Sequence, residues 1–234
     1  MAQRLAGRIA LITGASRGIG QAVAARFAAE GAELVLVART VGGLEETDDR
    51  VRAHGGQATL VPLDLRDGAG IERLAHALAE RHHRLDILVG NAGQLGTLTP
   101  LPHILANDWT EVMAVNVTAN WLLLRAFDPL LRTAPAGRAI FVTSGVTQSA
   151  AAYWGTYAIS KAALEAMVRV YAAEVATSAV RVNLLDPGPV RTRMRAQAFP
   201  GEDPATLPSP DSVAARFVDL AEPAWTENGA RVRA

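Results

Sequence analysis

Residues 8–31 read RIALITGASRGIGQAVAARFAAEG and contain the local elements on which the fold depends. The run RIALI at residues 8–12 is short and apolar, as expected for a strand buried in a parallel sheet. Residues 19–29 place apolar side chains four positions apart, which is typical of a helix that packs on one face. Gly31 follows directly, as a glycine that ends a helix would. This stretch is therefore expected to form a strand, a glycine turn and a helix.

The turn between this strand and helix has the spacing GxxxGxG, formed by Gly14, Gly18 and Gly20. Glycines let backbone N–H groups approach a pyrophosphate at the amino end of a helix. An ordinary tight turn could also need glycines, so the triplet alone does not define a site. The order of strand, glycine turn and helix favours a dinucleotide-binding site.

The second expected strand, residues 33–38, ends at Arg39, nineteen residues after Gly20. An NAD-binding fold places an acidic side chain about here to bind the ribose 2′-hydroxyl. An arginine at this point, with Arg17 in the glycine turn, would instead pair with a 2′-phosphate. The sequence therefore favours NADP over NAD, with solvated loop arginines as the alternative interpretation.

Strand and helix patterns continue to alternate along the chain. Further strands are expected at residues 57–62, 86–89, 138–143, 180–185 and 231–233, and helices at about 41–54, 69–81, 107–127, 156–175 and 211–220. This alternation predicts a single α/β domain over residues 1–234, with a doubly wound, Rossmann-like, mainly parallel seven-stranded sheet between two layers of helices. Ligands of such sheets bind outside the carboxyl ends of the strands.

Residues 144–161 carry a hydroxyl at Ser144, a phenol at Tyr157 and an amine at Lys161. Tyr157 and Lys161 are one helical turn apart and would share a helix face. The chain has 22 arginines and one lysine, which favours a chemical role for a compact ammonium at position 161, although one lysine must fall somewhere. Because an ammonium within about 4 to 6 Å favours a phenolate, we expect Lys161 to lower the Tyr157 pKa toward the working range.

Other candidate residues also follow strand ends. The carboxylate of Asp64, followed by Leu65, could accept a hydrogen bond from an adenine amino group or cap the next helix. Residues 90–93 are small enough to leave room for a planar ligand above the sheet. Asn116, on an otherwise apolar helix, needs polar partners and could be a satisfied structural amide. Residues 189–210 are rich in proline and polar groups and are expected to form a mobile substrate flap.

Composition argues against several classes of protein. The net charge of zero indicates neither nucleic acid nor an anionic membrane as a partner. Without cysteine there is no disulfide, thiolate metal site or cysteine nucleophile. His76, His82 and His83 lack acidic neighbours at ligand spacing, so no metal site is predicted. We see no signal peptide or membrane-spanning run and expect a cytoplasmic protein.

Jointly, these motifs resemble the short-chain dehydrogenase/reductase family over nearly the whole chain. The resemblance rests on TGASRGIG at 13–20, Asp64, NAG at 91–93, Asn116, Ser144, YAISK at 157–161 and PGPVRT at 187–192. It implies that Tyr157 is the general acid/base and Ser144 the hydrogen-bond donor to the substrate oxygen. It also implies that Lys161 binds the ribose and activates the phenol, and that Asn116 holds the water of a proton relay.

The resemblance implies the cofactor contacts as well. They are Gly14, Ser16, Arg17, Gly18, Ile19 and Gly20 around the phosphates, Arg39 at the 2′-phosphate, Asp64 and Leu65 at the adenine, Asn91 and Lys161 at the ribose, and Val190 and Thr192 at the nicotinamide carboxamide. Further cofactor contacts are Ala92, Gly93, Tyr157, Pro187 and Gly188. The chain departs from the family at Gly90 and Asp186, where members often carry asparagine.

The predicted activity is NADPH-dependent reduction of a carbonyl, or the reverse oxidation of a secondary alcohol, on a small to medium, mainly apolar substrate. Candidate pocket residues are Gln94, Leu95, Thr147, Gln148, Tyr153, Trp154, Met194 and Phe199, with flap arginines Arg191, Arg193 and Arg195 as possible charges. A non-catalytic dinucleotide-binding sensor or scaffold is the alternative, although such a protein could have lost the serine, tyrosine or lysine. NAD-dependent oxidation is a second alternative.

The helix expected at residues 156–175 is apolar nearly all round, with Glu165 and Arg169 as its one i, i+4 ion pair. A helix apolar on all sides is normally buried on all sides, and the sheet can cover one side only. A partner subunit is expected to cover the other side, together with the helix at residues 109–127. We therefore expect a homodimer or homotetramer.

Overall fold

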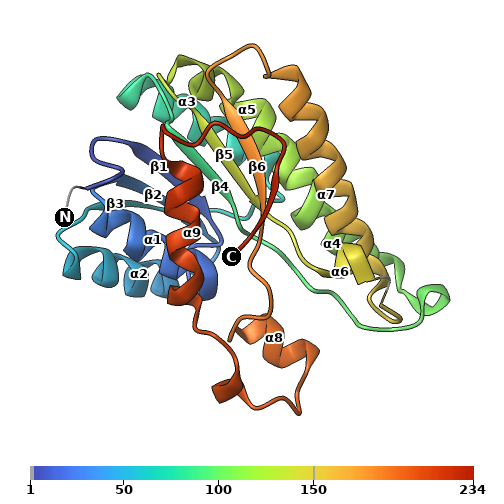
Figure 1. The fold of residues 1–234 in the computed structure, drawn as a ribbon. Coiled ribbons are helices and arrows are strands. Elements are labelled where there is room, and N and C mark those ends of the chain that lie inside the picture. Colours follow the sequence, from blue (N-terminus) through green and yellow to red (C-terminus); the bar gives the residue numbers. More distant parts are fainter. Residues whose placement is uncertain (1–2, 150) are drawn as a thin grey trace.

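Figure 1 shows the computed structural model of the chain, in which residues 3–149 and 151–234 are described. Its sheet consists of β1 (Ile9–Thr13), β2 (Glu33–Ala38), β3 (Ala58–Pro62), β4 (Ile87–Gly90), β5 (Arg138–Val142), β6 (Arg181–Asp186) and β7 (Arg231–Arg233). The strand order is β3-β2-β1-β4-β5-β6-β7, and every neighbouring pair is parallel. The order reverses beside β1, which opens a crevice at the carboxyl ends of β1 and β4. The predicted doubly wound parallel sheet is confirmed.

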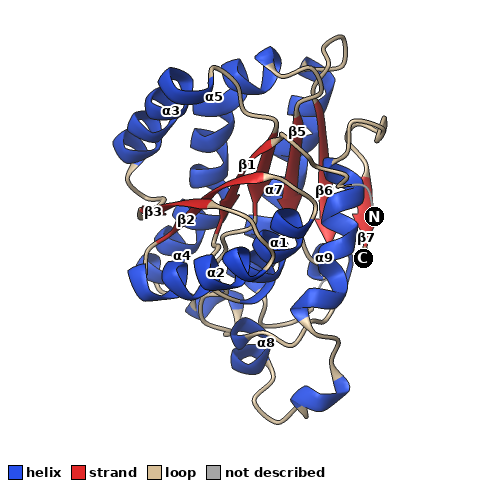
Figure 2. Ribbon diagram, turned by 90° about the vertical axis from the view of Figure 1, so that its left-hand side faces the viewer, coloured by secondary structure: helices blue, strands red, loops and turns tan. Residues whose placement is uncertain are grey.

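Helices cover both faces of this sheet, as the side view in Figure 2 shows. One layer holds α1 (Gly18–Ala29), α2 (Val41–Ala53) and α9 (Pro210–Ala221), and the other holds α3 (Gly68–His82), α4 (Ala106–Met113), α5 (Ala119–Thr133) and α7 (Gly155–Glu174). None of the helices among the described residues is both long enough and apolar enough to traverse a bilayer. Those residues also contain no group of three or more His, Asp or Glu side chains arranged to hold a metal ion.

Each face of the sheet has its own hydrophobic core. Ala10 and Ile12 of β1 face the core beneath α1 and α9, while Ile9 and Leu11 face the core beneath α5 and α7. Successive side chains of a strand point to opposite faces, so a strand between two cores is apolar at every position. This explains why the sequence of β1 is a continuous apolar run.

The helix expected at residues 107–127 is a longer element in three parts. α4 is followed by a π-helical turn, Ala114–Thr118, and then by α5. α4 begins at Ala106, after Leu105, and no described side chain caps it with a hydrogen bond. The Asp108 carboxylate instead accepts a hydrogen bond from the backbone N–H of Thr97 at 3.0 Å, and so holds the loop that follows β4.

The helix after β3 is capped by Asp67, because the backbone N–H of Gly70 donates to its carboxylate at 2.9 Å. Capping by Asp64 was the expected alternative and is wrong, since α3 begins only at Gly68. The Asp64 carboxylate pairs with the Arg66 guanidinium at 2.6 Å. That hydrogen-bonded pair holds the pKa of Asp64 below its ordinary value.

The segment predicted as a flap contains a short helix, α8 (Arg193–Ala198), which lies beyond the carboxyl edge of the sheet (Figure 1). Thr192 caps it by accepting a hydrogen bond from the backbone N–H of Arg195 at 3.2 Å. The Arg195 guanidinium pairs with Glu202 at 2.6 Å and stacks 3.7 Å from the Phe199 ring centroid. These contacts fold the segment back on itself beside the sheet.

Gly90, the last residue of β4, is the direct partner of Phe141 on β5. A Cβ atom at position 90 would overlap the Phe141 ring and lie 2.7 Å from the Asn120 side-chain oxygen. The phenyl ring therefore occupies the space that a side chain at position 90 would need. This packing leaves no room for the asparagine that members of the resembled family often carry there.

Candidate active site

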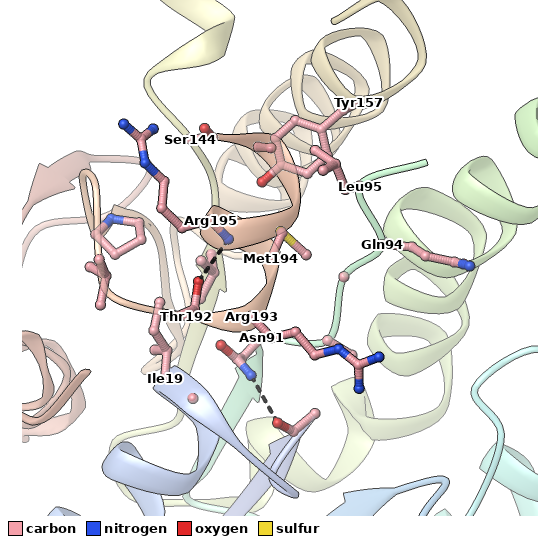
Figure 3. Close-up of a pocket in the computed structure, with 18 of the residues that line it drawn as sticks. Ile19, Asn91, Gln94, Leu95, Ser144, Tyr157, Thr192, Arg193, Met194 and Arg195 are labelled. Carbon is pink, nitrogen blue, oxygen red and sulfur yellow. Dashed lines mark hydrogen bonds between the residues drawn. The ribbon is translucent and has the colours of Figure 1, made fainter. Parts of the chain in front are cut away.

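A cavity of about 1130 Å³ runs along the carboxyl edge of the sheet, between the strand-end loops, the amino end of α1, α7 and α8 (Figure 3). It brings together all the predicted catalytic and cofactor residues except Gly20 and Asn116. Of the candidate pocket residues, Thr147 and Tyr153 do not line it. Thr147 turns back to the Glu165 carboxylate at 2.9 Å, and the Tyr153 side chain is exposed to solvent.

The glycine turn forms the part of the cavity next to α1. Gly14 and Gly18 have φ angles of 65° and 59°, which favour glycine. The Asn91 side-chain amide donates to the carbonyl oxygens of Thr13 at 2.9 Å and Gly14 at 3.3 Å, and so holds the turn from β4 (Figure 3). Gly20 lies behind the turn, where a Cβ atom would be 2.6 Å from that amide nitrogen. Its role is to let helix and turn pack closely, which is why it does not line the cavity.

Three observations test whether this part of the cavity fits a phosphorylated dinucleotide. The first backbone N–H groups of α1 have no side-chain cap, and such free N–H groups bind phosphate oxygens. The Arg17 and Arg39 side chains flank the cavity and are exposed. Within residues 3–149 and 151–234, neither guanidinium forms a hydrogen bond or ion pair. The residues present therefore fit a pyrophosphate and an additional ribose phosphate.

Tyr157, Lys161 and Ser144 meet in the middle of the cavity. The Tyr157 and Lys161 side chains share one face of α7 and are 8 % and 3 % exposed. The Lys161 ammonium donates to the backbone carbonyl oxygen of Val142 at 2.8 Å. Its nitrogen lies 5.7 Å from the Tyr157 ring centroid. Ser144 follows β5, and Figure 3 shows its hydroxyl and the phenol on the same side of the cavity, near Leu95 and Met194.

Burial controls the proton affinities of this site. It raises the pKa of Tyr157 to about 12, with a hydrogen bond to Ser144 opposing the rise and the Asp186 charge adding to it. Burial also lowers the pKa of Lys161 to about 8. The expectation that Lys161 lowers the Tyr157 pKa is therefore wrong for this structure, because desolvation of the phenol dominates. The ammonium is itself desolvated and is directed at a backbone carbonyl.

Asn116 lies in the π-helical turn with its side chain fully buried. Its amide group donates to the Gln94 carbonyl at 2.9 Å and accepts from the Gln94 N–H at 2.8 Å. The amide nitrogen also donates to the Ser160 hydroxyl at 2.9 Å. The Asn116 side chain therefore has all the polar partners of a structural amide, which was one of the interpretations that the sequence allowed. It holds the cavity wall at Gln94. The water of a proton relay at Asn116 stays a prediction.

The substrate end of the cavity has apolar walls. Leu95, Val146 and Tyr157 form a small buried cluster with Trp154 and Met194 packed against it. The Trp154 ring lies 6.0 Å from the Tyr157 ring and 5.7 Å from the Phe199 ring, measured between centroids. Trp154 therefore lies between the phenol and Phe199, the residue that follows α8.

Of the basic side chains that line the cavity, Arg231 and Arg233 were not predicted from the sequence. Basic side chains on the lining are Arg17, Arg39, Lys161, Arg191, Arg193, Arg195, Arg231 and Arg233. Among the described lining residues, the acidic ones are Asp64 and Asp186, and both are paired with arginine. Arg193 and Arg195 leave α8 in opposite directions (Figure 3). The cavity is thus cationic within a chain of zero net charge.

Comparison with known proteins agrees with this geometry. A family model described as short chain dehydrogenase matches residues 8–203. The uncharacterized oxidoreductase YciK of Escherichia coli strain K12 is 39% identical over 209 residues, which cover 88% of this chain and 82% of that protein. The rhamnolipids biosynthesis 3-oxoacyl-[acyl-carrier-protein] reductase of Pseudomonas aeruginosa strain PAO1 is 39% identical over 199 residues, covering 81% of this chain and 75% of that protein.

A solved structure extends the comparison to a bound cofactor. A short chain dehydrogenase of Escherichia coli CFT073 complexed with NADPH is 36% identical, with a TM-score of 0.94 over 100% of this chain and 99% of that one. The protein belongs to the short-chain dehydrogenase/reductase family. It is therefore an NAD(P)-dependent oxidoreductase that acts on CH–OH and C=O groups.

Proposed function

We propose that this enzyme uses NADPH to reduce a carbonyl group, and that it oxidises the corresponding secondary alcohol in the reverse direction. The single observation that supports this most strongly is the meeting of Ser144, Tyr157 and Lys161 in one cavity with the uncapped amino end of α1. A redox sensor or scaffold would need the uncapped amino end of α1 to bind a dinucleotide, but it would not need the serine, tyrosine and lysine side chains.

The chain's own groups supply the proton chemistry. The glycine turn and the amino end of α1 would hold a nicotinamide dinucleotide, which would supply the hydride for the carbonyl carbon. Because the pKa of Tyr157 is raised to about 12, its phenol carries a proton at neutral pH and can give it to the carbonyl oxygen. The Ser144 hydroxyl donates a hydrogen bond to the same oxygen. Alcohol oxidation needs the phenolate and so becomes faster as the pH rises.

The preference for NADP is part of the proposal. Arg17 and Arg39 are exposed on the cavity and form no hydrogen bond or ion pair with any other described residue. Two unneutralised guanidinium groups favour a ribose 2′-phosphate over a free hydroxyl. The similar dehydrogenase complexed with NADPH supports the same choice. NAD-dependent oxidation is the alternative, and it requires no contribution from these arginines.

A carbonyl panel tests the proposed activity. Wild type and Tyr157→Phe are mixed with NADPH and with neutral or carboxylate-bearing aldehydes and ketones, and the loss of NADPH absorbance is followed. We expect wild-type turnover and a loss of about 10²- to 10⁴-fold in the variant. NADPH affinity, measured by fluorescence titration, should be the same in both proteins. Near-full turnover by Tyr157→Phe would contradict the proposal, whereas tight NADPH binding without wild-type turnover on any compound would favour a sensor.

We also propose a homodimer or homotetramer that forms through α7 and α5. The outer face of α7 carries Ile159 and Val170, which are eleven residues apart and lie on one side of the helix. Both side chains are exposed, as is Trp121 on α5. Large apolar side chains grouped on an outer face are typical of a subunit interface.

A further inference from the structure

Arg231, on the last strand of the sheet, lies directly behind Ser144. Its Nη2 group donates to the Ser144 backbone carbonyl at 3.1 Å and to the Asp186 carboxylate at 3.0 Å. Its Nε group lies 3.3 Å from the Glu165 carboxylate. One guanidinium from β7 therefore connects the loop after β5, the end of β6 and helix α7.

The two carboxylates are buried, with side-chain exposures of 5% for Glu165 and 7% for Asp186. Glu165 also accepts hydrogen bonds from the Thr143 hydroxyl at 2.6 Å and the Thr147 hydroxyl at 2.9 Å. A buried carboxylate without a cation is costly. Within the described part of the chain, Arg231 is the cation that pairs with both Glu165 and Asp186. The exposed Arg169 guanidinium pairs with Glu165 only, at a distance of 3.7 Å.

These contacts bear on the catalytic hydroxyl. The Ser144 carbonyl also accepts from the Thr147 backbone N–H at 3.2 Å, and the Thr147 hydroxyl oxygen, which donates to Glu165, lies 3.0 Å from it. Arg231 thus completes a set of donors that fixes the Ser144 backbone. Asp186 and Tyr157 line the same cavity, and the Asp186 charge adds to the rise of the Tyr157 pKa that burial causes. The family asparagine would bring no charge to position 186, so this chain needs a cation there.

We propose that Arg231 is a positioning residue that fixes Ser144 and screens Tyr157 from the charge of Asp186. The inference rests on the proposed function for its effect on turnover, but the screening itself can be measured without turnover. Several charged groups share the cavity with the phenol. They are Lys161 from α7, Asp186 from β6, Arg231 and Arg233 from β7, and Arg191, Arg193 and Arg195 from the segment around α8, where Glu202 neutralises Arg195. The loop after β4 and the turn after Ser144 contribute uncharged side chains.

The direction of each effect follows from these charges. Without Arg231, the unscreened Asp186 carboxylate disfavours the phenolate, so the pKa of Tyr157 rises. With asparagine at 186 the repulsion disappears, and the pKa falls. The double variant Arg231→Gln/Asp186→Asn should return toward the wild-type value, because the two changes remove opposite charges at one contact.

A phenol titration tests the screening. Tyrosinate absorbance is recorded against pH for wild type, Asp186→Asn, Arg231→Gln and the double variant, each with its Tyr157→Phe counterpart subtracted. We expect Asp186→Asn to titrate below wild type and Arg231→Gln above it. Arg169→Gln is the matched control, since it removes a guanidinium from Glu165 without touching Ser144 or Asp186, and it should leave the Tyr157 titration unchanged.

Turnover tests the positioning of Ser144. We expect kcat to fall about tenfold or more in Arg231→Gln, with unchanged NADPH affinity, because a small displacement of a reacting group lowers the rate strongly. Arg231→Lys should restore the titration but not the full kcat, since one ammonium cannot replace all three contacts. If the Arg231→Gln variant does not fold, the Tyr157 titration of the Asp186→Asn variant decides whether the Asp186 charge acts on the phenol. An unshifted Tyr157 titration in Asp186→Asn overturns the inference, whether or not any substrate is found.

Discussion

The Lys161 ammonium nitrogen lies 2.8 Å from the backbone carbonyl oxygen of Val142, so the sole lysine of the chain ties α7 to the carboxyl end of β5. β5 leads to Ser144, and α7 carries Tyr157. The hydrogen bond therefore joins the two elements that carry the hydroxyl and the phenol. It also holds the ammonium within the buried part of the cavity, beside Gly93, where a Cβ atom would lie 3.6 Å from the nitrogen.

Lys161→Arg should inactivate the enzyme even though the charge is kept. A planar guanidinium is larger than an ammonium and cannot make the same single contact in a fully buried space. We expect kcat to fall by about 10²-fold or more, as measured by NADPH consumption in the presence of the best substrate from the carbonyl panel. Arg169→Lys, the reverse exchange on the exposed face of the same helix, is the control. Wild-type kcat in the Lys161→Arg variant would show that the close contact with Val142 is dispensable.

The two directions of the reaction should respond oppositely to alkaline pH. Reduction uses the protonated phenol, and the pKa of Tyr157 near 12 keeps it protonated, but Lys161 loses its charge as the pH rises through about 8. We therefore expect the reduction rate to fall above about pH 8, while oxidation, which uses the phenolate, rises with pH. Initial rates in both directions between neutral and alkaline pH provide the measurement. Parallel profiles for the two directions would contradict these roles.

Arg39→Asp should change the cofactor preference. A carboxylate at the end of β2 repels a 2′-phosphate and can accept from a 2′-hydroxyl. We expect the ratio of NADPH to NADH affinity to fall about tenfold or more, equivalent to at least about 1.4 kcal/mol. Fluorescence titrations with both cofactors measure it, and Arg52→Asp, on the far side of α2, is the control. Equal affinities of wild type for the two cofactors would contradict the proposed use of NADP.

Val170→Glu should dissociate the proposed oligomer. Val170 is 59% exposed on the outer face of α7, and a carboxylate buried there without a partner is costly. We expect wild type to sediment as a dimer or tetramer at micromolar concentration and the variant to sediment as a monomer. Glu80→Lys, an exposed charge change on α3, should leave the assembly intact. A monomeric wild type would remove the basis for this interface.

The sequence predicted most of what depends on local spacing. Tyr157 and Lys161 are one helical turn apart, so periodicity alone puts them on one face. The inner strands β1, β2 and β4 are mainly apolar runs, because each lies between two cores. The glycine turn after β1 is also a local feature, and the position of Gly14 and Gly18 at the cavity follows from the order of strand and helix.

Features that depend on distant contacts could not be predicted in this way. Arg231 reaches Ser144 across 87 residues of sequence, and nothing near either residue indicates that contact. The direction of the Tyr157 pKa shift depends on how deeply α7 is buried, which residue spacing does not reveal. Asn116 and Gly20 were expected in the cavity, but their positions behind its wall depend on a π-helical turn and on close packing with Asn91.

The pairing of Gly90 with Phe141 has a consequence for how this sequence can change. Asparagine cannot be introduced at the end of β4 while a phenyl ring fills that volume, and loss of the ring alone would leave a void between the strands. Neither exchange is tolerable by itself, so the two positions are constrained to vary together. A lineage that carries glycine at one is expected to retain the aromatic residue at the other.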